Sequence, residues 1–169
     1  MGKRTRIIND PSELITLLRI FGSEPHKKIF DILSTEWKTV EDLSTVSDND
    51  VPEIMAFLKK SGLIESKWRI PEPGKTPDKE YHTSYSKVQL NFQCSLEDLS
   101  GLIQLTFRTE NEIRDSMIAI EEEVKKGNQS MNGLCRVFGK SSLFIRGIAR
   151  RSSKLNVKGQ RIEWTEGAE

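Results

Sequence analysis

Apolar residues recur at helical spacing in four successive segments of the first sixty positions. Glycines at 22 and 62 follow the first and fourth segments, where a helix is expected to end. Residues that cap helices begin the four segments: Asp10-Pro11-Ser12-Glu13, Ser23, Thr39-Val40-Glu41-Asp42 and Ser47-Asp48-Asn49-Asp50. The side chains expected to face inward are Leu14, Leu17, Leu18 and Phe21, then Ile29, Phe30, Ile32 and Leu33, then Leu43, and finally Val51, Ile54, Met55 and Leu58.

Two strand-like runs follow the fourth helix, at residues 63–70 and 80–85. The loop between them, 71–79, holds three prolines that restrict it, and Gly74 allows a turn beside Lys75. Two helices, a short helix, a longer helix and then a hairpin is the order of a winged helix-turn-helix domain. The hairpin is therefore expected to be its wing.

The pattern after the hairpin returns to helices. Val88, Leu90 and Phe92 alternate with polar residues, which indicates one further strand or an extended exit from the wing. Ser95 is expected to start a helix, and the capping box at 109–112 starts a longer one. The apolar positions of these two helices are Leu99, Leu102, Ile103 and Phe107, then Ile113, Met117, Ile120 and Val124. This stripe predicts either a symmetric dimer interface or packing between domains.

The last forty residues repeat the helix–helix–hairpin order in shorter form. Residues 131–138 are helical in pattern, and Gly139 ends them. A second helix is expected from Ser141 or Ser142 to about Leu155, and residues 156–164 form a small hairpin around Gly159. The sequence predicts a mainly α protein with small β wings. It has a winged helix-turn-helix over 7–93, a helical linker or dimerisation region over 94–127, and a smaller basic helix-turn-helix or minimal winged helix over 128–166.

Charge is distributed unevenly along a chain whose net charge is only +1. Residues 94–127 hold four basic and eight acidic groups, whereas residues 128–169 hold eight basic and three acidic ones. Arg146, Arg150 and Lys154 are spaced i, i+4 and i+8, which would align them on one helix face, and Lys158 and Arg161 flank the hairpin turn. These five cations are predicted to bind DNA phosphates. A solvated basic face, or salt bridges with the acidic middle segment, is the alternative.

The fourth helix and the wing offer a second candidate surface. Lys60 is expected on the outward face of that helix, together with Glu53. Acidic residues repel phosphates, so the helix is predicted either to read base edges with help from the wing or to bind protein. The wing supplies the cations Lys67, Arg69, Lys75 and Lys79 and an aromatic surface at Trp68. A solvated hairpin edge is the alternative interpretation of the wing.

Other classes of site find little support in the sequence. Cys94 and Cys135 are too few and too distant for a disulfide framework or a cysteine-rich zinc site. No phosphate-binding glycine loop, paired-histidine motif or nucleophile motif occurs, so no enzyme activity, cofactor or metal is predicted. No apolar run is long enough to cross a bilayer and no secretory signal is recognised, so a cytoplasmic protein without a membrane partner is expected.

The first 93 residues resemble the ArsR-type winged-helix regulators, in particular an archaeal branch. The sequence segments that carry the resemblance are DPSELITLLRIFGSEPHKKIFDIL, TVEDL, VPEIMAFLKKSGLIES and the wing. It implies a dimeric repressor that binds specific double-stranded DNA. Metal-sensing members carry cysteines on the short helix, where this chain has TVEDLSTVS, so the resemblance implies no metal sensing there. The alternative function is that of an adaptor that binds a protein of the transcription machinery.

Overall fold

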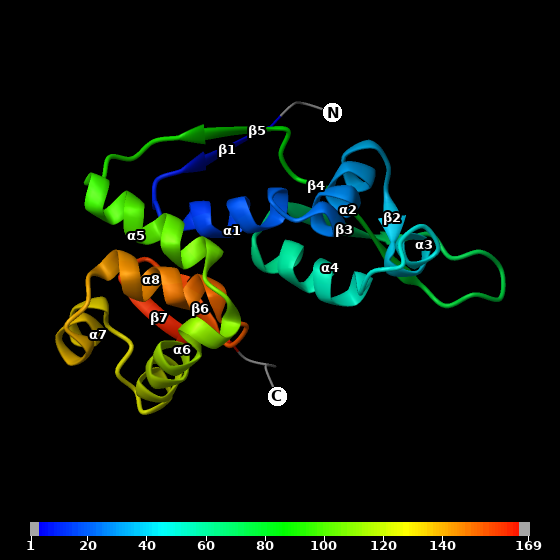
Figure 1. The fold of residues 1–169 in the computed structure, drawn as a ribbon. Coiled ribbons are helices and arrows are strands. Elements are labelled where there is room, and N and C mark those ends of the chain that lie inside the picture. The colour runs from blue at the N-terminus through cyan, green and yellow to red at the C-terminus, as the bar shows by residue number, and fades with distance from the viewer. Residues whose placement is uncertain (1–3, 166–169) are drawn as a thin grey trace. The chain divides into compact units, whose positions relative to one another are not determined.

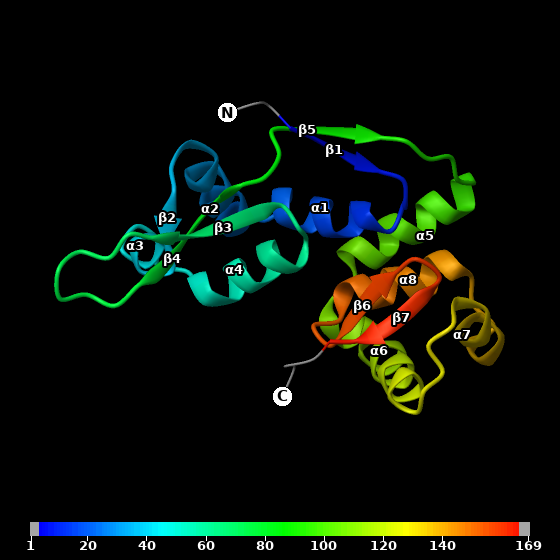
Figure 2. The same cartoon turned by 180° about the vertical axis from the view of Figure 1, so that it is seen from behind.

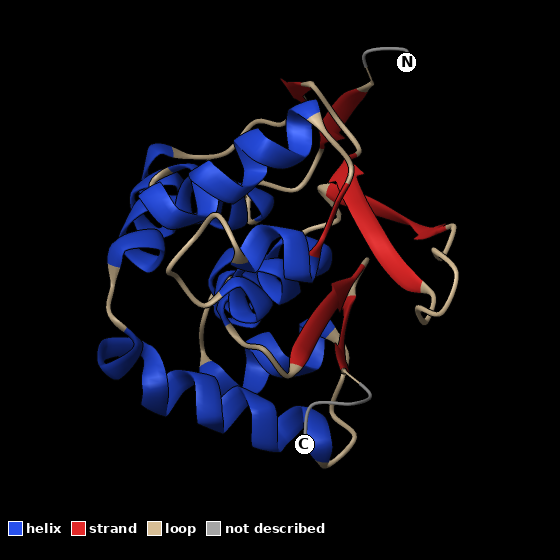
Figure 3. Cartoon of the chain, turned by 90° about the vertical axis from the view of Figure 1, so that its right-hand side faces the viewer, coloured by secondary structure: helices blue, strands red, loops and turns tan. Residues whose placement is uncertain are grey.

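The computed structural model describes residues 4–165 of the chain, which form eight helices and seven strands (Figure 1). The chain divides into two compact units. The first comprises the residues up to Ile8 together with Arg19–Asn91, and the second comprises Asn9–Leu18 and the residues from Phe92 onward. The strands belong to three small sheets, so the protein is of mixed α and β structure with short strands (Figure 3).

The first unit has the element order helix, short helix, helix, hairpin. Its elements are α2 (Glu24–Thr35), β2 (Lys38–Thr39), α3 (Val40–Ser44), α4 (Val51–Lys60), β3 (Ile64–Arg69) and β4 (Asp78–Thr83). Strand β4 lies in the middle of a three-stranded antiparallel sheet with the order β2-β4-β3. This order is compatible with a winged helix-turn-helix. The predicted strands 63–70 and 80–85 are observed as β3 and β4, and Gly74 in their loop has a φ of 87°.

The core of the first unit is built from the predicted apolar positions of α2, α3 and α4. The fully buried side chains there are Ile29, Leu33, Leu43, Val51, Met55 and Leu58, with Ile54 nearly so. The expectation for α1 (Glu13–Phe21) is partly wrong, because Leu18 and Phe21 are exposed while Ile15 and Ile20 are buried. At 100° per residue Ile15 and Ile20 lie about 140° apart, so they do not form one stripe. Helix α1 crosses from the second unit to the first, and Ile15 belongs to the apolar cluster of the second unit whereas Ile20 belongs to the first unit.

A short parallel ribbon joins two distant parts of the first unit. Strand β1 (Thr5–Ile8) pairs in parallel with β5 (Lys87–Leu90), with Ile8 opposite Leu90. The alternation at 88–92 indicated the second of these strands. Nothing in the sequence indicated β1, because four residues carry little periodicity and the partner is about eighty positions away.

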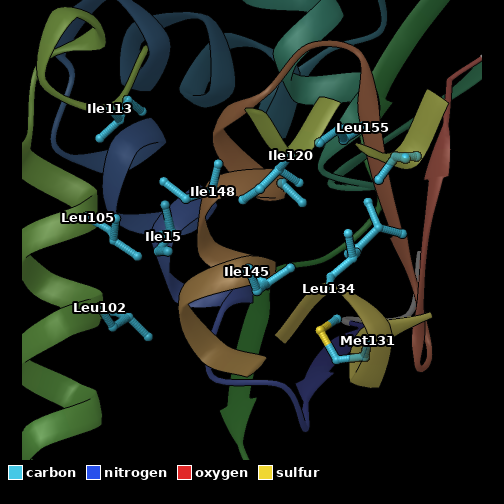
Figure 4. Close-up of a cluster of buried hydrophobic side chains, with 13 residues drawn as sticks. Ile15, Leu102, Leu105, Ile113, Ile120, Met131, Leu134, Ile145, Ile148 and Leu155 are labelled. Carbon is cyan, nitrogen blue, oxygen red and sulfur yellow. The ribbon is translucent and has the colours of Figure 1, made fainter. Parts of the chain in front are cut away.

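The second unit is a helical cluster closed by a small hairpin (Figure 2). Its elements are the first half of α1, α5 (Leu96–Phe107), α6 (Glu110–Lys125), α7 (Met131–Phe138), α8 (Ser142–Arg151), β6 (Leu155–Lys158) and β7 (Arg161–Trp164). Thr109 and Glu112 form the predicted capping box at the start of α6. Figure 4 shows Ile145 and Ile148 of α8 among the side chains of the apolar cluster, which also holds Leu105, Ile120 and Leu134.

Helix α8 is shorter than the sequence predicted. It ends at Arg151 because Ser152 adopts an extended backbone, with ψ of 137°, and Leu155 begins β6 instead of ending the helix. The Ser152 hydroxyl donates a hydrogen bond of 2.6 Å to Glu121 Oε1 on α6. Lys154 therefore lies in the turn after α8, and the predicted row of three cations on one helix face is wrong for its third member.

Candidate nucleic-acid interface

Helix α4 presents one continuous exposed face. Its side chains at Val51, Ile54, Met55 and Leu58 are buried, whereas Pro52, Glu53, Ala56, Lys59 and Lys60 are exposed. The Asp50 carboxylate accepts a hydrogen bond of 3.2 Å from the Glu53 backbone N–H, which caps the helix. The exposed face therefore runs from an acidic beginning to a basic end, where the lysines complement the helix dipole.

The β3–β4 hairpin, residues 64–83, has two chemically different faces. Residues directly opposite each other in an antiparallel pair point to the same side of the sheet. The register therefore places Ser66, Trp68, Lys79 and Tyr81 on one side, which we call the Trp68 face. The other side carries Glu65, Lys67, Arg69, Asp78, Glu80 and His82, and we call it the paired face.

Two cations of the paired face, Lys67 and Arg69, form ion pairs. Arg69 lies 2.7 Å from Asp42 of α3 and 2.9 Å from Glu80, and Lys67 Nζ lies 3.3 Å from the same glutamate. Lys67 Nζ also lies 4.1 Å from the centre of the Trp37 ring. Hydrogen bonding from the Thr39 backbone, and then from Arg69, lowers the pKa of Asp42, while Arg69 lowers the pKa of Glu80. Of the two predicted DNA contacts, Arg69 thus anchors the hairpin to α3, whereas Lys67 is held by Glu80 within the hairpin and lies over Trp37.

The Trp68 face combines aromatic rings with lysines. Trp68 is 64% exposed, and Lys79 Nζ lies 5.1 Å from the centre of its ring. Lys59 Nζ of α4 lies 4.5 Å from the centre of the Tyr81 ring, so the basic end of α4 adjoins this face. Within the described strands β3 and β4, every acidic side chain lies on the paired face instead. The register of the hairpin therefore separates the acids from the Trp68 face.

Two lysines lie at the end of α4 near this face, and the sequence predicted only one of them as a site residue. Lys60 was predicted as a site residue and is exposed, whereas Lys59 was not predicted. A helical wheel cannot show that Tyr81 lies beside Lys59. Lys75, also predicted, lies in the loop, where it pairs with Glu72 at 2.8 Å. This contact raises the pKa of Lys75 and lowers that of Glu72.

The predicted cations of α8 lie in ion pairs within the second unit. Arg146 and Arg150 both approach Asp10, at 3.7 and 3.2 Å. Arg150 Nε also donates a hydrogen bond of 3.3 Å to the Ser12 hydroxyl, and Arg146 donates one of 3.3 Å to Gln160 Oε1. Both guanidinium groups therefore tie α8 to the segment that precedes α1 or to the hairpin turn.

Helix α8 itself is enclosed. None of its ten described residues, from Ser142 to Arg151, is exposed. Arg151 is buried and donates hydrogen bonds of 2.7 and 2.8 Å to the backbone carbonyls of Leu105 and Arg108 at the end of α5. Lys154 lies 3.4 Å from Glu121. The residues of this helix that are not buried, among them Arg146 and Arg150, are half-buried.

The β6–β7 hairpin carries the two remaining predicted cations, and both are exposed. Lys158 lies 3.7 Å from Glu163, and Arg161 donates a hydrogen bond of 2.8 Å to Gln129 Oε1. Their positions flank the turn at Gly159, as the sequence predicted.

The apolar stripe of α5 and α6 is divided between core and surface. Leu102, Ile113, Ile120 and Val124 belong to the buried cluster of the second unit. Ile103 and Phe107 of α5 are exposed, and so is Leu96. These three residues lie within about 40° of one another on the helix, so α5 keeps an exposed apolar stripe.

Residues 4–165 contain no group of three histidine, cysteine or acidic side chains placed to hold a metal ion. Cys94 is exposed and Cys135 is half-buried, and both are free thiols. In the same described part of the chain, no helix has the length and apolar character that crossing a membrane requires.

Comparison with known proteins adds one finding to this geometry. The family model described as ArsR transcriptional regulator matches residues 8–166. The resemblance seen in the sequence covered only about the first 93 residues, so the match extends it through the second unit. No curated protein matches the chain.

Proposed function

The chain belongs to the ArsR family of transcriptional regulators, and from this premise we propose how it binds DNA. The first unit acts as a winged helix-turn-helix, of the archaeal branch of the family, with α3 and α4 as the helix pair and the β3–β4 hairpin as the wing. Helix α4 enters the major groove, and the wing contacts the adjacent backbone. The division into a winged domain over 7–93, a linker over 94–127 and a basic segment over 128–166 is part of the same proposal.

One observation carries the proposal. The exposed face of α4 ends at Lys59, which lies over Tyr81 on the Trp68 face of the wing. The lysines Lys59, Lys60 and Lys79 therefore belong to a helix face and a hairpin face that adjoin, and a polyanion can contact both at once. The acidic residues of the wing strands lie on its opposite face, where Glu80 pairs with Lys67 and Arg69.

The acidic beginning of α4 fits a role in reading bases. Asp48, Asp50 and Glu53 are exposed there, and carboxylates are poor partners for phosphate. An acidic side chain accepts a hydrogen bond from the cytosine amino group in the major groove, which contributes to discrimination between bases. The proposal therefore assigns sequence preference to the beginning of α4 and phosphate contact to its end.

The second unit has a supporting role in this proposal. Lys158 and Arg161 of the β6–β7 hairpin are exposed and can contact a further phosphate row. Arg146, Arg150 and Lys154 stay a prediction as DNA contacts. Their observed partners, Asp10 and Glu121, favour a contribution to the stability of the unit.

We further propose that the protein is a homodimer. A second copy of the chain covers the exposed stripe of α5, formed by Leu96, Ile103 and Phe107, and two-fold symmetry then presents two α4 helices to two half-sites. Phe107→Lys should convert the dimer to a monomer in sedimentation at tens of micromolar protein. A wild-type chain that sediments as a monomer at this concentration would contradict the dimer.

The test of the DNA surface compares lysines of the two hairpin faces. Binding of a fluorescein-labelled duplex of about 30 base pairs and mixed sequence is measured over a range of salt concentrations. Replacing Lys59, Lys60 and Lys79 by glutamine should flatten the salt slope by up to about 0.9 for each phosphate that the lysines had neutralised. Lys67→Gln, on the paired face, is the matched control and should leave the slope unchanged. Equal slopes for the triple variant and the wild type would refute this surface.

A further inference from the structure

The β3–β4 hairpin ends in exposed apolar side chains, which phosphate binding does not explain. Trp68 is 64% exposed, and Ile70, directly after β3, is 90% exposed. Pro71 and Pro73 follow them in the exposed loop. We propose that Trp68 and Ile70 form an apolar wedge that enters the minor groove and partly unstacks a base step. This inference rests on the proposed DNA binding and names how the hairpin takes part in it.

The charge of the hairpin is unsuited to attracting DNA from a distance. Residues 64–83 hold four basic and four acidic side chains. Most of them are paired: Lys67 and Arg69 with Glu80, Arg69 also with Asp42, and Lys75 with Glu72. The wing of a protein that binds only phosphates would present an excess of cations. This hairpin presents a ring and an aliphatic side chain instead.

The wedge is rigidly mounted. Pairing of β3 with β4 continues to Arg69 opposite Asp78, so Trp68 lies one residue inside the last pair. On the reverse side, Arg69 joins the hairpin to Asp42 of α3. Three prolines, at 71, 73 and 77, restrict the loop beyond it. The backbone that carries Trp68 therefore loses little conformational entropy when the ring enters a groove, which favours insertion.

Although the charge of the whole hairpin is balanced, its Trp68 face carries no acidic side chain of β3 or β4, and this complementarity identifies DNA as the occupant of the face. Lys79 lies against the Trp68 ring, and Lys59 lies against Tyr81 on the same face. These cations flank an apolar centre, and the acids of β3 and β4 lie on the opposite side. Proteins that bend DNA combine the same parts, since they insert apolar side chains between base steps and neutralise the adjoining phosphates. A partner protein is the alternative occupant, and the experiment distinguishes the two.

The experiment measures affinity and bending for the full chain. A duplex of about 30 base pairs and mixed sequence carries a donor and an acceptor dye at its ends. At about 50 mM salt, where non-specific binding is favoured, the wild type should bind and shorten the distance between the dyes. Trp68→Ala should weaken binding about tenfold, because stacking of a base on an aromatic ring contributes on that order. It should also abolish the bend and leave the salt slope unchanged, since the cations that face the phosphates stay in place. Trp68→Phe should keep most of the affinity and the bend.

The controls separate the wedge from folding and from the proposed function. Lys79→Gln should flatten the salt slope, which Trp68→Ala does not. Trp68 is exposed, so thermal melting of Trp68→Ala should match that of the wild type. Wild-type binding and bending that Trp68→Ala leaves intact would overturn the wedge and assign the face to a protein partner. A wild type that binds no duplex at this salt concentration would instead overturn the proposed function itself.

Discussion

The two units contain the same order of elements, but they expose them in opposite ways. In the first unit α3, α4 and the β3–β4 hairpin follow one another, and in the second unit α7, α8 and the β6–β7 hairpin do. Helix α4 buries one face and exposes the other, whereas α8 has no exposed residue among its ten. A shared order of elements therefore does not give the second helix the same exposure in the two units.

The hairpins differ in a related way. Strands β3 and β4 have six residues each and are joined by a loop of residues 70–77, while β6 and β7 have four each and a turn at Gly159. The long hairpin extends beyond the elements that support it. The short one closes the core of the second unit, to which Leu155 and Ile162 contribute fully buried side chains.

The largest expected effect comes from a comparison in which one lysine is placed on α8 and another on α4. Ala149 of α8 is fully buried and Ala56 of α4 is exposed. Ala149→Lys should destabilise the protein by about 5 kcal/mol, since a buried ammonium group loses its hydration and overfills the core. Ala56→Lys should change stability by less than about 0.5 kcal/mol and steepen the salt slope of DNA binding. Chemical denaturation measures the change in stability of each variant. Equal destabilisation by Ala149→Lys and Ala56→Lys would contradict the difference in exposure between α8 and α4.

The close approach of α8 to its neighbours can be tested with a single methyl group. A Cβ atom on Gly147 would lie 2.6 Å from Leu105 Cδ1 and 3.0 Å from Ile15 Cδ1. We expect Gly147→Ala to destabilise the protein by about 2 kcal/mol through overpacking. Gly101 of α5 has no atom within 4 Å of that position, so Gly101→Ala should stabilise by up to about 1 kcal/mol. A stabilising Gly147→Ala in thermal or chemical denaturation would show that α8 is loosely packed.

Replacing Asp10, the shared partner of Arg146 and Arg150, tests whether these arginines contribute to stability or to DNA binding. We expect Asp10→Asn to lower the free energy of unfolding by about 1–2 kcal/mol, because two half-buried guanidinium groups lose a charged partner. The salt slope of DNA binding should stay the same. A steeper slope in Asp10→Asn would mean that the released arginines contact phosphate, as the sequence predicted.

The smallest expected effect is a difference in acid sensitivity. Both histidines of the chain, His26 and His82, lie in the first unit. Burial, followed by repulsion from Arg19, lowers the pKa of His26 below its ordinary value of 6.5. Folding therefore favours the neutral ring. Its contribution to stability is fully present above pH 6.5 and is lost as the pH falls through the lower folded pKa.

Amide exchange between about pH 7.5 and 5 should accordingly show the first unit loosening while the second changes little. His26→Gln should remove most of this pH dependence. The ring of His26 contacts Phe57 with centres 5.5 Å apart, so the variant is compared with itself across pH and not with the wild type at one pH. Equal loosening of both units would assign the effect to carboxylates.

Local signals in the sequence located most helices and the long hairpin. The capping boxes at Thr39 and Thr109 are present in the structure, and Val51, Ile54, Met55 and Leu58 are buried as their spacing predicted. Such signals act over three or four residues, so a single sequence displays them completely. The sequence did not predict strand β1 or the end of α8, because both depend on partners at distant positions. Strand β1 pairs with residues that include Val88–Leu90, and Ser152 after α8 bonds to Glu121.

The sequence by itself determined where helices start, which stripes are apolar and where cations are concentrated. Only the tertiary structure decided which cations lie open to a polyanion. Arg146 and Arg150 are spaced i, i+4 on one helix face, yet both approach Asp10. Lys79 instead lies beside the exposed Trp68 ring, and the exposed Lys59, which was not predicted as a site residue, lies over Tyr81. The physical reason is that charge belongs to a residue, whereas its availability depends on the partners that folding brings within a few ångströms.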